Sequence, residues 1–489
     1  MKTVSVARRR FLQGVATVAV IGFDPVRRSW LTEAQAGRPL SKIPRLDGEL
    51  VTDAASLASA ADDFGHFVHR SPRAVLRPGS TDDVVAMVRY AKQHRLQIAA
   101  RGQGHSTNGQ SQVEAGIVID TSTLASIQVN ANDAVVGPGA RWREVLGATL
   151  PRRLTPPTLP NFLDLTVGGN IAVGGIGGAA YRHGAVVDNV LELEVVTGTG
   201  HLRRCSATRD PALFHAVLGG LGQFGIVVRA RLRLVRARQL ARVYSLQYPD
   251  VPSLLEDARF LAFDERFDHL EGQINPDAAG QYGSATLLAV KFFDPPASPD
   301  DAELLGGLAP ASSTTADLPY EAFVGRIDPL VEMAKAVGAW ALPHPFFDVF
   351  LPDSTVEQFL GEIVSTLTID DTGNGPVVLY PLRRSRLRRP FLRVPERDEV
   401  LFLFDVLGYA PPVPEVVAQQ VARNTRWLHR ARHLGGKAYN IGSLNLTRDD
   451  WKAHFSPIWP AAVLAKLAYD PANILTPGQG IFPSGRCDD

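Results

Sequence analysis

The chain has 489 residues, about three times the size of a typical ~150-residue domain, so two or three domains are expected. Hydrophobic residues make up 45% and charged residues 21%, which is the composition of a folded globular protein. Fifty-one Lys and Arg residues against 50 Asp and Glu residues leave no basic field of the kind that nucleic-acid binding requires. Only two cysteines occur, Cys205 and Cys487, which excludes a disulfide scaffold and a cysteine-rich metal site but does not decide whether they pair.

The first 36 residues have the pattern of an export signal. Arg8 to Arg10 precede Phe11-Leu12 and a short apolar run, and Ala34 to Ala36 offer small residues for cleavage. The run is shorter than the ~20 apolar residues that span a bilayer, and the paired arginines resemble a twin-arginine signal, which exports folded proteins. A disordered basic tail is the alternative. We therefore predict a secreted or extracytoplasmic protein, with no stable membrane insertion after the signal is removed.

Residues 72–238 alternate between short β-rich runs and helical segments. A helix is predicted over 82–91, capped by Ser80 or Thr81, and strands over 96–100 and 116–120. The period-two pattern of 191–197 and the turn at 198–200 predict a hairpin with 201–204. A helix over 212–218 then precedes a strand over 226–235 that has one basic face.

After residue 239 the sequence predicts strands over 243–248, 287–293 and 401–407, and helices over 356–367 and 415–429. The last fifty residues again contain motif-like segments rich in Gly and Pro. We therefore predict an α+β protein in four parts: the signal (1–36), a first domain (37–238), an inserted second domain (239–434) with an antiparallel sheet, and a closing segment (435–489) that rejoins the first domain.

Three glycine clusters stand out in the first domain. Residues 100–110 (ARGQGHSTNGQ) predict a strand entering a loop whose backbone N–H groups can converge on a bound anion such as a pyrophosphate. Residues 168–178 hold six glycines and are expected to form neither a stable helix nor a strong strand, but a backbone that wraps a flat ligand. An ordinary turn and a flexible linker are the respective alternatives.

The third cluster, Gly219 to Gly225, contains a formal G-x-G-x-x-G motif. In a dinucleotide-binding fold this motif follows a strand and opens a helix. Here a helix is predicted before it and a strand after it. The reversed order argues against NAD as the cofactor.

The segments Arg101 to Ser106, Leu165 to Gly169, Arg182 to Gly184, Asn189 to Leu193 and Leu218 to Ile226 together resemble the vanillyl-alcohol oxidase/p-cresol methylhydroxylase superfamily of flavoproteins. Within it the sequence is most similar to the cytokinin dehydrogenases (cytokinin oxidases). The resemblance extends from about residue 70 to 483. It implies a two-subdomain FAD-binding domain, a separate substrate domain over the flavin ring, and FAD as the cofactor.

By this resemblance His105 carries the covalent bond to FAD, and a neutral imidazole nitrogen preceded by glycine has the required nucleophilicity and access. A histidine that only forms hydrogen bonds is the alternative. The other residues implied in FAD binding are Arg101, Gly102, Gln103, Gly104, Ser106, Gln110, Thr166, Gly169, Gly174, Ile176, Gly177, Ile226 and Gln479. No metal ligand is predicted.

The resemblance breaks at the proton acceptor. Cytokinin dehydrogenases have an aspartate shortly before the Leu165 to Gly169 segment, and Asn161 occupies that position here. An amide accepts a hydrogen bond but not a proton, so the usual base is missing. The candidates to replace it are Asp164, Glu271 and Tyr380. His183 is an alternative that is set aside in favour of a structural role in a turn. His269 and His344 are interpreted as domain-packing residues, and Asp405 as a carboxylate at a strand edge.

Three functions follow from these observations. The first is an FAD-dependent oxidoreductase that takes hydride from a C–H next to nitrogen, as in a cytokinin-like secondary amine, and is reoxidised by O₂ or a quinone-like acceptor. The second is an alcohol or sugar oxidase on the same scaffold, because Asn161 replaces the usual aspartate. The third is a flavin-binding protein without turnover.

Overall fold

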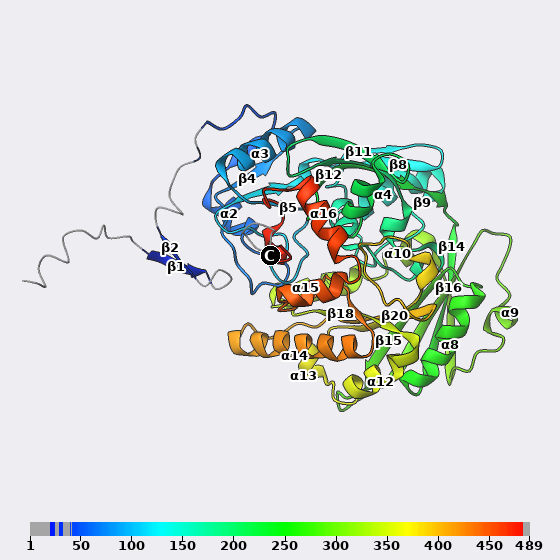
Figure 1. Ribbon diagram of the computed structural model, residues 1–489. Coiled ribbons are helices and arrows are strands. Elements are labelled where there is room, and N and C mark those ends of the chain that lie inside the picture. Colours follow the sequence, from blue (N-terminus) through cyan, green and yellow to red (C-terminus); the bar gives the residue numbers. More distant parts are fainter. Residues whose placement is uncertain (1–19, 25–28, 33–39, 41, 483–489) are drawn as a thin grey trace, which may run out of the picture. The chain divides into compact units, whose positions relative to one another are not determined.

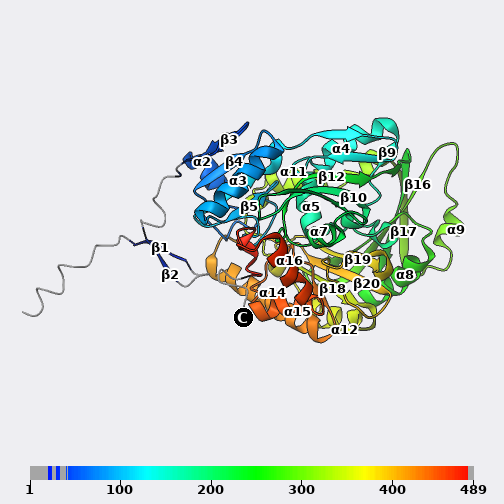
Figure 2. The same ribbon diagram turned by 45° about the horizontal axis from the view of Figure 1, so that its top comes forward.

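The computed structural model describes residues 20–24, 29–32, 40 and 42–482, which form two units that divide after Arg45. In the first unit, β1 (Val20–Asp24) pairs antiparallel with β2 (Ser29–Thr32). The rest of the predicted export signal lies outside the described residues. The elements that follow belong to the second unit (Figures 1 and 2).

A four-stranded sheet precedes the first glycine loop. Its order is β3 (Glu49–Val51), β4 (Ala74–Arg77), β6 (Ile117–Asp120) and β5 (Ile98–Arg101), with β6 parallel to both β4 and β5. The helices α2 (Ala54–Ala60) and α3 (Thr81–His94) accompany it, and the Ser80 side chain caps α3 by accepting a hydrogen bond from the Asp83 N–H. The predicted helix and both strands are confirmed, and β5 leads directly into the His105 loop.

A five-stranded sheet follows. Its order is β11 (Leu202–Ser206), β10 (Val190–Val196), β12 (Ile226–Arg233), β8 (Asp133–Val136) and β7 (Ile127–Val129). The predicted hairpin is confirmed by the pairing of β10 with β11, and β12 alternates between buried aliphatic residues and arginines. β9 (Leu154–Thr155) pairs separately with β13 (Val235–Arg236). The helices of this region are α4 (Trp142–Thr149), α5 (Val167–Val173), α6 (Ala180–His183) and α7 (Pro211–Val217).

Helix α5 contradicts the expectation that the second glycine cluster forms no helix. The Thr166 side chain caps it by accepting from the Gly169 N–H, and the buried side chains of Val167 and Ile171 attach it to the core. These contacts outweigh the low helix propensity of glycine, which is a weak tendency in a packed interior. Gly168 is required there because a Cβ atom would approach Pro138 to 2.8 Å.

The second half of the chain is built on an eight-stranded sheet whose strand pairs are all antiparallel. In order, its strands are β17 (Ser312–Pro319), β14 (Leu240–Tyr248), β16 (Tyr282–Phe293), β15 (His269–Pro276), β19 (Val377–Arg383), β20 (Val400–Val406), β18 (Phe347–Pro352) and β21 (Lys437–Ala438). The three strands predicted after residue 239 are confirmed. Asp405 is not at a strand edge, because β20 lies between β19 and β18.

The two faces of this sheet have different partners. Helices α8 (Val251–Asp264), α12 (Asp353–Val364) and α14 (Pro414–His433) cover one face, with α12 and α14 confirming the predicted helices (Figure 1). The side chains of Val378, Tyr380 and Leu403 on the other face belong to the core that also contains Ile171 and Val186. We call this the inner face. Shorter helices are α9 (Asp301–Leu305), α10 (Tyr320–Val324), α11 (Asp328–Ala336) and α13 (Ile369–Thr372).

The last part of the described chain returns to the first half. After β21 come α15 (Arg448–Phe455) and α16 (Trp459–Tyr469), and α16 packs on α7. The Ile98 N–H of β5 donates to the Ile474 carbonyl at 2.7 Å, and the Thr476 N–H donates to the Ile98 carbonyl at 2.8 Å. No helix in the described ranges is long and apolar enough to cross a membrane. Cys205 on β11 is buried, and Cys487 lies outside the described residues.

A buried ion pair fixes this return. Lys466 and Asp470 are fully buried, with 2.8 Å between Nζ and Oδ2, and the Asp470 carboxylate also accepts from the N–H groups of Ile474 and Leu475. The Lys466 ammonium donates to the Gln223 carbonyl at 3.1 Å. The pair therefore holds the C-terminal segment on both β5 and the third glycine cluster.

We expect Lys466→Ala to lower the free energy of unfolding by about 3–5 kcal/mol, because it leaves Asp470 as an unpaired buried charge. Denaturant unfolding of the purified protein measures the change. Lys452→Ala is the control, because the Lys452 side chain is 42% exposed and its partner Asp449 is 93% exposed, so a change of less than about 1 kcal/mol is expected. Equal effects of the two variants would contradict the anchoring role.

Candidate active site

The loop after β5 is held from behind by a buried carboxylate. Asp63 Oδ2 accepts from the Ser106 hydroxyl at 3.0 Å and from the Gly109 N–H at 2.7 Å. The backbone N–H groups of Phe64 and Gly65 donate to the Gly104 and Ser106 carbonyls. Burial raises the pKa of Asp63 to about 6, against the lowering effect of these hydrogen bonds. The sequence reasoning missed Asp63, since nothing in its local pattern connects it to a loop forty positions later.

His105 lies among aromatic rings. Its imidazole stacks on the Phe64 ring with 4.1 Å between centroids, and the rings of Phe162 and Trp340 lie at 5.0 and 5.9 Å. Burial, with a smaller contribution from His344, lowers the pKa of His105 to about 3. The imidazole is therefore neutral at physiological pH, which is the form that can act as a nucleophile.

The first two glycine clusters meet at Gly102. A Cβ atom there would lie 2.1 Å from the Thr166 hydroxyl, and one at Gly104, where φ is +67°, would collide with the Arg101 guanidinium. The structure therefore brings the His105 loop against the cap of α5, where Gly169 also lies. Only glycine permits this approach of the two backbones.

The C-terminal segment reaches the same loop. The Arg70 guanidinium donates to the Gly109 carbonyl at 2.7 Å and to the Gly478 carbonyl at 3.2 Å. Arg70 thereby joins the segment that contains Gln110 to the segment that contains Gln479. Gln110 also donates to the Gly442 carbonyl at 3.2 Å. Of the remaining cofactor candidates, Gln103 is exposed and Ile226 is buried at the start of β12.

Residues 174–178 lie on the inner face of the eight-stranded sheet. The Gly175 N–H donates to the Tyr439 hydroxyl at 3.1 Å, and the Leu270 N–H donates to the Gly178 carbonyl at 2.9 Å. Cβ atoms at Gly177 and Gly178 would lie 2.0 Å from the Leu159 carbonyl oxygen and 2.4 Å from the His269 ring. This segment, which holds Gly174, Ile176 and Gly177, therefore joins the glycine loops to the sheet.

The third glycine cluster has the reversed order of elements that the sequence predicts. Helix α7 precedes it and β12 follows it. Its residues contact neighbouring segments: the Gly219 N–H donates to the Ile171 carbonyl, and the Gly222 carbonyl accepts from the Thr476 hydroxyl at 2.8 Å. The cluster is therefore a packing junction between α5 and the C-terminal segment.

Three of the four catalytic candidates meet in one hydrogen-bonded cluster. The Asn161 amide donates to the Glu271 carboxylate at 3.0 Å and to the Tyr380 hydroxyl at 2.7 Å. Arg326, in the loop between α10 and α11, donates to the Asn161 amide oxygen at 2.9 Å and forms a short ion pair with Glu271. His269 contributes its Nε2 at 3.2 Å from the same carboxylate.

Charge compensation keeps Glu271 ionised. Burial raises its pKa, but the Arg326 guanidinium, the His269 ring and the Asn161 amide together lower the pKa to about 2. An ion-paired carboxylate with this pKa is a poor proton acceptor near neutral pH. Burial and the nearby carboxylates of Glu271 and Asp405 raise the pKa of Tyr380 well above its usual value, so the phenol stays protonated.

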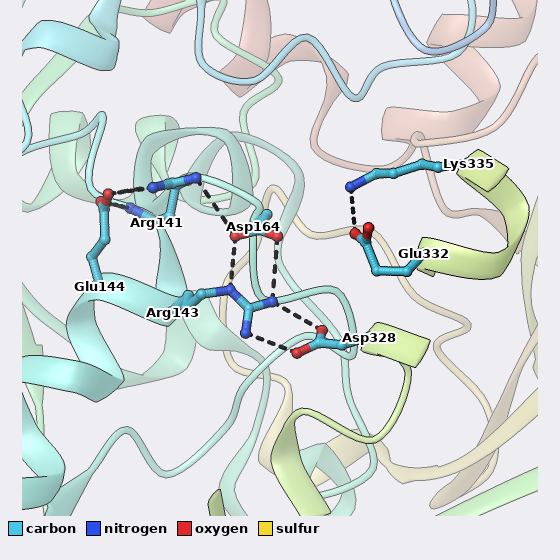
Figure 3. Close-up of polar contacts among 7 residues, drawn as sticks. All are labelled: Arg141, Arg143, Glu144, Asp164, Asp328, Glu332 and Lys335. Carbon is cyan, nitrogen blue, oxygen red and sulfur yellow. Dashed lines mark hydrogen bonds and ion pairs between the residues drawn. The ribbon is translucent and has the colours of Figure 1, made fainter. Parts of the chain in front are cut away.

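Asp164, the fourth candidate, contacts Arg143 and Arg141 instead (Figure 3). Its carboxylate receives the Arg143 Nε at 3.0 Å, and the same guanidinium binds Asp328 on α11 through contacts of 2.8 and 2.9 Å. Arg141 approaches Asp164 at 3.7 Å. The structure therefore places Asp164 in an ion-pair bridge between α4 and α11, and gives no support to its candidacy as the base.

The histidines set aside in the sequence have distinct positions. His269 lies against Glu271 and its ring packs edge-on against Phe323 with 5.0 Å between centroids, so it is a member of the polar cluster as well as a packing residue. His344 stacks on Phe64 at 3.9 Å. Burial lowers the pKa of both, and of His183. Among the described residues, no group of three or more His, Cys, Asp or Glu side chains could hold a metal ion.

Comparison with known proteins agrees with this architecture. Residues 72–206 match the FAD binding domain, and residues 302–482 match the family described as cytokinin dehydrogenase 1, FAD and cytokinin binding. Among solved structures, 6-hydroxy-D-nicotine oxidase from Arthrobacter nicotinovorans superposes with a TM-score of 0.68 at 23% identity, covering 90% of this chain and 97% of that one. A VAO-type flavoprotein from Myceliophthora thermophila also gives 0.68, at 18% identity, covering 84% and 80%.

Three curated relatives are similar over most of their length. An uncharacterized oxidoreductase of the fasciation locus of Rhodococcoides fascians is 39% identical, covering 87% of this chain and 97% of the relative. Cytokinin dehydrogenase 2 of Arabidopsis thaliana is 32% identical, covering 92% and 97%, and cytokinin dehydrogenase 4 of rice is 35% identical, covering 90% and 91%.

The FAD-binding domain and the relatives define an FAD-dependent oxidoreductase, and its fold is similar to that of a VAO-type flavoprotein. Within that class, the chain belongs to the cytokinin dehydrogenase family. The residues present fit FAD: a Cβ atom at Gly102 would collide with the Thr166 hydroxyl, so the two glycine-rich segments meet without a side chain at Gly102, and glycine-rich loops are able to direct backbone N–H groups at a pyrophosphate.

We expect Arg326→Gln to lower the free energy of unfolding at neutral pH by about 3 kcal/mol, because Glu271 then becomes an unpaired buried carboxylate. The lowered pKa of Glu271 means that its stabilising contribution is present above pH 4.5 and is lost as the pH falls towards 2. The variant should lose this acid-dependent part of its stability, as measured by denaturant unfolding at a series of pH values.

Arg143→Gln serves as the matched control, because its side chain is 42% exposed and its ion pairs are expected to contribute less than about 1 kcal/mol. Adding Glu271→Gln to Arg326→Gln should restore much of the lost stability. A double variant as unstable as the single one would show that Arg326 acts by packing and not by charge.

Proposed function

We propose that the protein oxidises a substrate C–H bond next to nitrogen, as in a cytokinin-like secondary amine. The observation that carries this proposal is the cluster of Asn161, Glu271 and Tyr380, which offers oxygen atoms that can accept a hydrogen bond from a substrate N–H. When bound, FAD supplies the acceptor for the hydride. Membership in the cytokinin dehydrogenase family supports the amine as the substrate class.

In this proposal the chain's own residues orient the substrate and handle the proton. The Glu271 carboxylate, fixed by Arg326, accepts hydrogen bonds and so positions a nitrogen donor. Tyr380 holds a proton at its hydroxyl oxygen, which Asn161 in turn orients. The proposed electron acceptor is O₂ or a quinone-like compound, and the twin-arginine-like residues 1–36 support export of the folded protein.

An alcohol or sugar oxidase is the second candidate. It is favoured by Asn161, which replaces the carboxylate that accepts the amine proton in cytokinin dehydrogenases, and by the ion pair that keeps Glu271 from acting as a base. In this second candidate, the substitution at Asn161 reflects the use of a different proton acceptor for the substrate hydroxyl.

Anaerobic mixing of the flavin-loaded protein with substrate classes tests the two candidates. We expect adenine-type secondary amines to bleach the flavin absorbance faster than primary alcohols or sugars at equal concentration. Bleaching by alcohols or sugars alone would reject amine oxidation and favour the second candidate. Inhibition of amine-driven bleaching by a non-oxidisable purine would show that the amine and the purine bind at the same site.

Asn161→Asp sharpens this screen, because it restores a carboxyl group beside Glu271. If the missing base limits the reaction, amine-driven flavin reduction should rise by about 10²-fold, the lower end of what a positioned base contributes. Asp164→Asn is the control and should leave the rate unchanged, since Asp164 is bound to Arg143. An unchanged rate in Asn161→Asp would indicate that another group takes the proton.

We also propose that FAD is bound covalently through His105. The neutral imidazole and the glycine on its amino-terminal side support this attachment. Acid-precipitated protein should keep its yellow colour in the pellet, and His105→Ala should release FAD into the supernatant. Free FAD from the unaltered protein would contradict the covalent bond.

A further inference from the structure

Four polar side chains form a row across adjacent strands of the inner face. They are Glu271 on β15, Tyr380 on β19, Asp405 on β20 and Asp348 on β18, in the order of the strands in the sheet. Asp405 pairs in register with Asp348, and on its other side with Val378, two residues before Tyr380. Because side chains alternate between faces along a strand, these residues share the inner face.

The two aspartates at one end of this row have no ion-pair partner among the described residues. Asp348 is 0% exposed and Asp405 is 5% exposed. Neither carboxylate forms an ion pair within the described part of the chain, and both Asp348 oxygens and Asp405 Oδ1 lack a hydrogen-bond partner there. Glu271, at the other end, has Arg326. Unlike Glu271, therefore, Asp348 and Asp405 are not held by an ion pair with a basic side chain in the described part of the chain.

Two buried carboxylates side by side cannot both be ionised without a cation. Burial and mutual repulsion raise the pKa of Asp348 well above its usual value, and burial raises that of Asp405. The titratable groups that face the pair are Glu271 on β15, Tyr380 on β19 and Tyr439 after β21, and each of these is an acid. Two such neighbouring carboxyl groups are expected to titrate as a unit, with both pKa values raised by burial.

The pair also contacts residues that are hydrogen-bonded to the His105 loop and to residues 174–178. A Cβ atom at Gly442 would lie 2.6 Å from Asp348 Oδ2, and the Gly442 carbonyl accepts from Gln110 of the His105 loop. The Tyr439 N–H donates to the Asp348 carbonyl at 3.1 Å, while its hydroxyl accepts from Gly175. The acids thus lie where the sheet meets both glycine loops.

We propose that Asp348 and Asp405 share one proton and, acting through Tyr380, accept the proton that the substrate loses during oxidation. The inference rests on the proposed function. It supplies the acceptor that Asn161 cannot be and that Glu271, held by Arg326, does not provide. Tyr380 lies between Glu271 and Asp405 in the row, and a diagonal neighbour on the next strand is within reach of an aromatic side chain.

The step balances as follows. The substrate C–H leaves as hydride to the flavin, which is reduced, and the substrate carbon is oxidised to form a C=N bond, or C=O for an alcohol. The nitrogen or oxygen proton moves to the Tyr380 oxygen while the Tyr380 proton moves to the ionised carboxylate of the pair. The pair then holds two protons and returns one to water before the next turnover.

The proton on the pair can be observed without any substrate. The infrared spectrum of the flavin-loaded protein at neutral pH should contain the C=O stretch of a protonated buried carboxyl, and Asp348→Asn/Asp405→Asn should lose it. Asp257→Asn is the matched control: Asp257 is a buried carboxylate on α8, beyond the opposite face of the sheet, and accepts from the Tyr248 hydroxyl at 2.6 Å. This control should keep the band.

The role in turnover is tested by the pH profile of anaerobic flavin reduction by the substrate found in the screen. Asp405→Asn should lower the rate by about 10²-fold and displace the ionisation seen near neutral pH, whereas Asp257→Asn should keep the profile. Tyr380→Phe should lower the rate by a similar factor. The variant Asp405→Asn/Tyr380→Phe should lose no more activity than either single variant, because both residues belong to one relay.

A band that persists in the double aspartate variant, or a pH profile that Asp405→Asn leaves unchanged, overturns the proposal even when the substrate is oxidised. If no substrate class reduces the flavin, the proposed function fails, and the infrared band still decides whether the pair holds a proton. Additive losses in Asp405→Asn/Tyr380→Phe would overturn the relay through Tyr380.

Discussion

The close approach of a glycine-rich backbone to the inner face of the eight-stranded sheet determines how this protein is assembled. Residues 174–178 are hydrogen-bonded to Tyr439 at one end and to Leu270 at the other, and a side chain at Gly178 would displace the His269 ring. The polar cluster, the flavin loops and the sheet therefore have one common contact surface. Larger residues in this segment would separate the two halves of the site.

Charge is distributed unevenly over that face. Glu271 is neutralised by Arg326 and is a fixed acceptor, whereas Asp348 and Asp405 have no cation and retain a proton. The pKa of Glu271, whose side chain is 16% exposed, is lowered, whereas the pKa values of the buried Asp348 and Asp405 are raised, and of the three only Glu271 has an arginine partner among the described residues. Such a separation of pKa values within one site is the arrangement by which enzymes divide acid and base roles.

Much of the fold follows from local sequence. Three predictions depend only on neighbouring residues, and each is confirmed: the capped helix α3, the hairpin of β10 and β11, and the helix before and strand after Gly219 to Gly225. Helix α5 was predicted wrongly because its stability comes from the Thr166 cap and from tertiary burial. The resemblance identified the position of Asn161, with Glu271 and Tyr380 as candidates to replace the missing base, and the structure brings these three together.

The rest of the site depends on contacts that no local pattern contains. Arg326 comes from a loop between two short helices, and its pairing with Glu271 is visible only in three dimensions. The run Val400–Val406 is buried on both faces, so the sequence does not reveal whether Asp405 lies at an edge or opposite Asp348. Asp63 likewise holds a loop far along the chain.

The return of the C-terminal segment also orders events during biosynthesis. Arg70 joins Gly109 to Gly478, which lies 408 positions after Arg70, and β5 completes its pairing only with Ile474 to Thr476. The ribosome must therefore release nearly the whole chain before the His105 loop is closed. The cofactor is therefore bound only after translation is nearly complete. A chain shortened by a premature stop after β21 retains every strand of the four-, five- and eight-stranded sheets but lacks the closed loop.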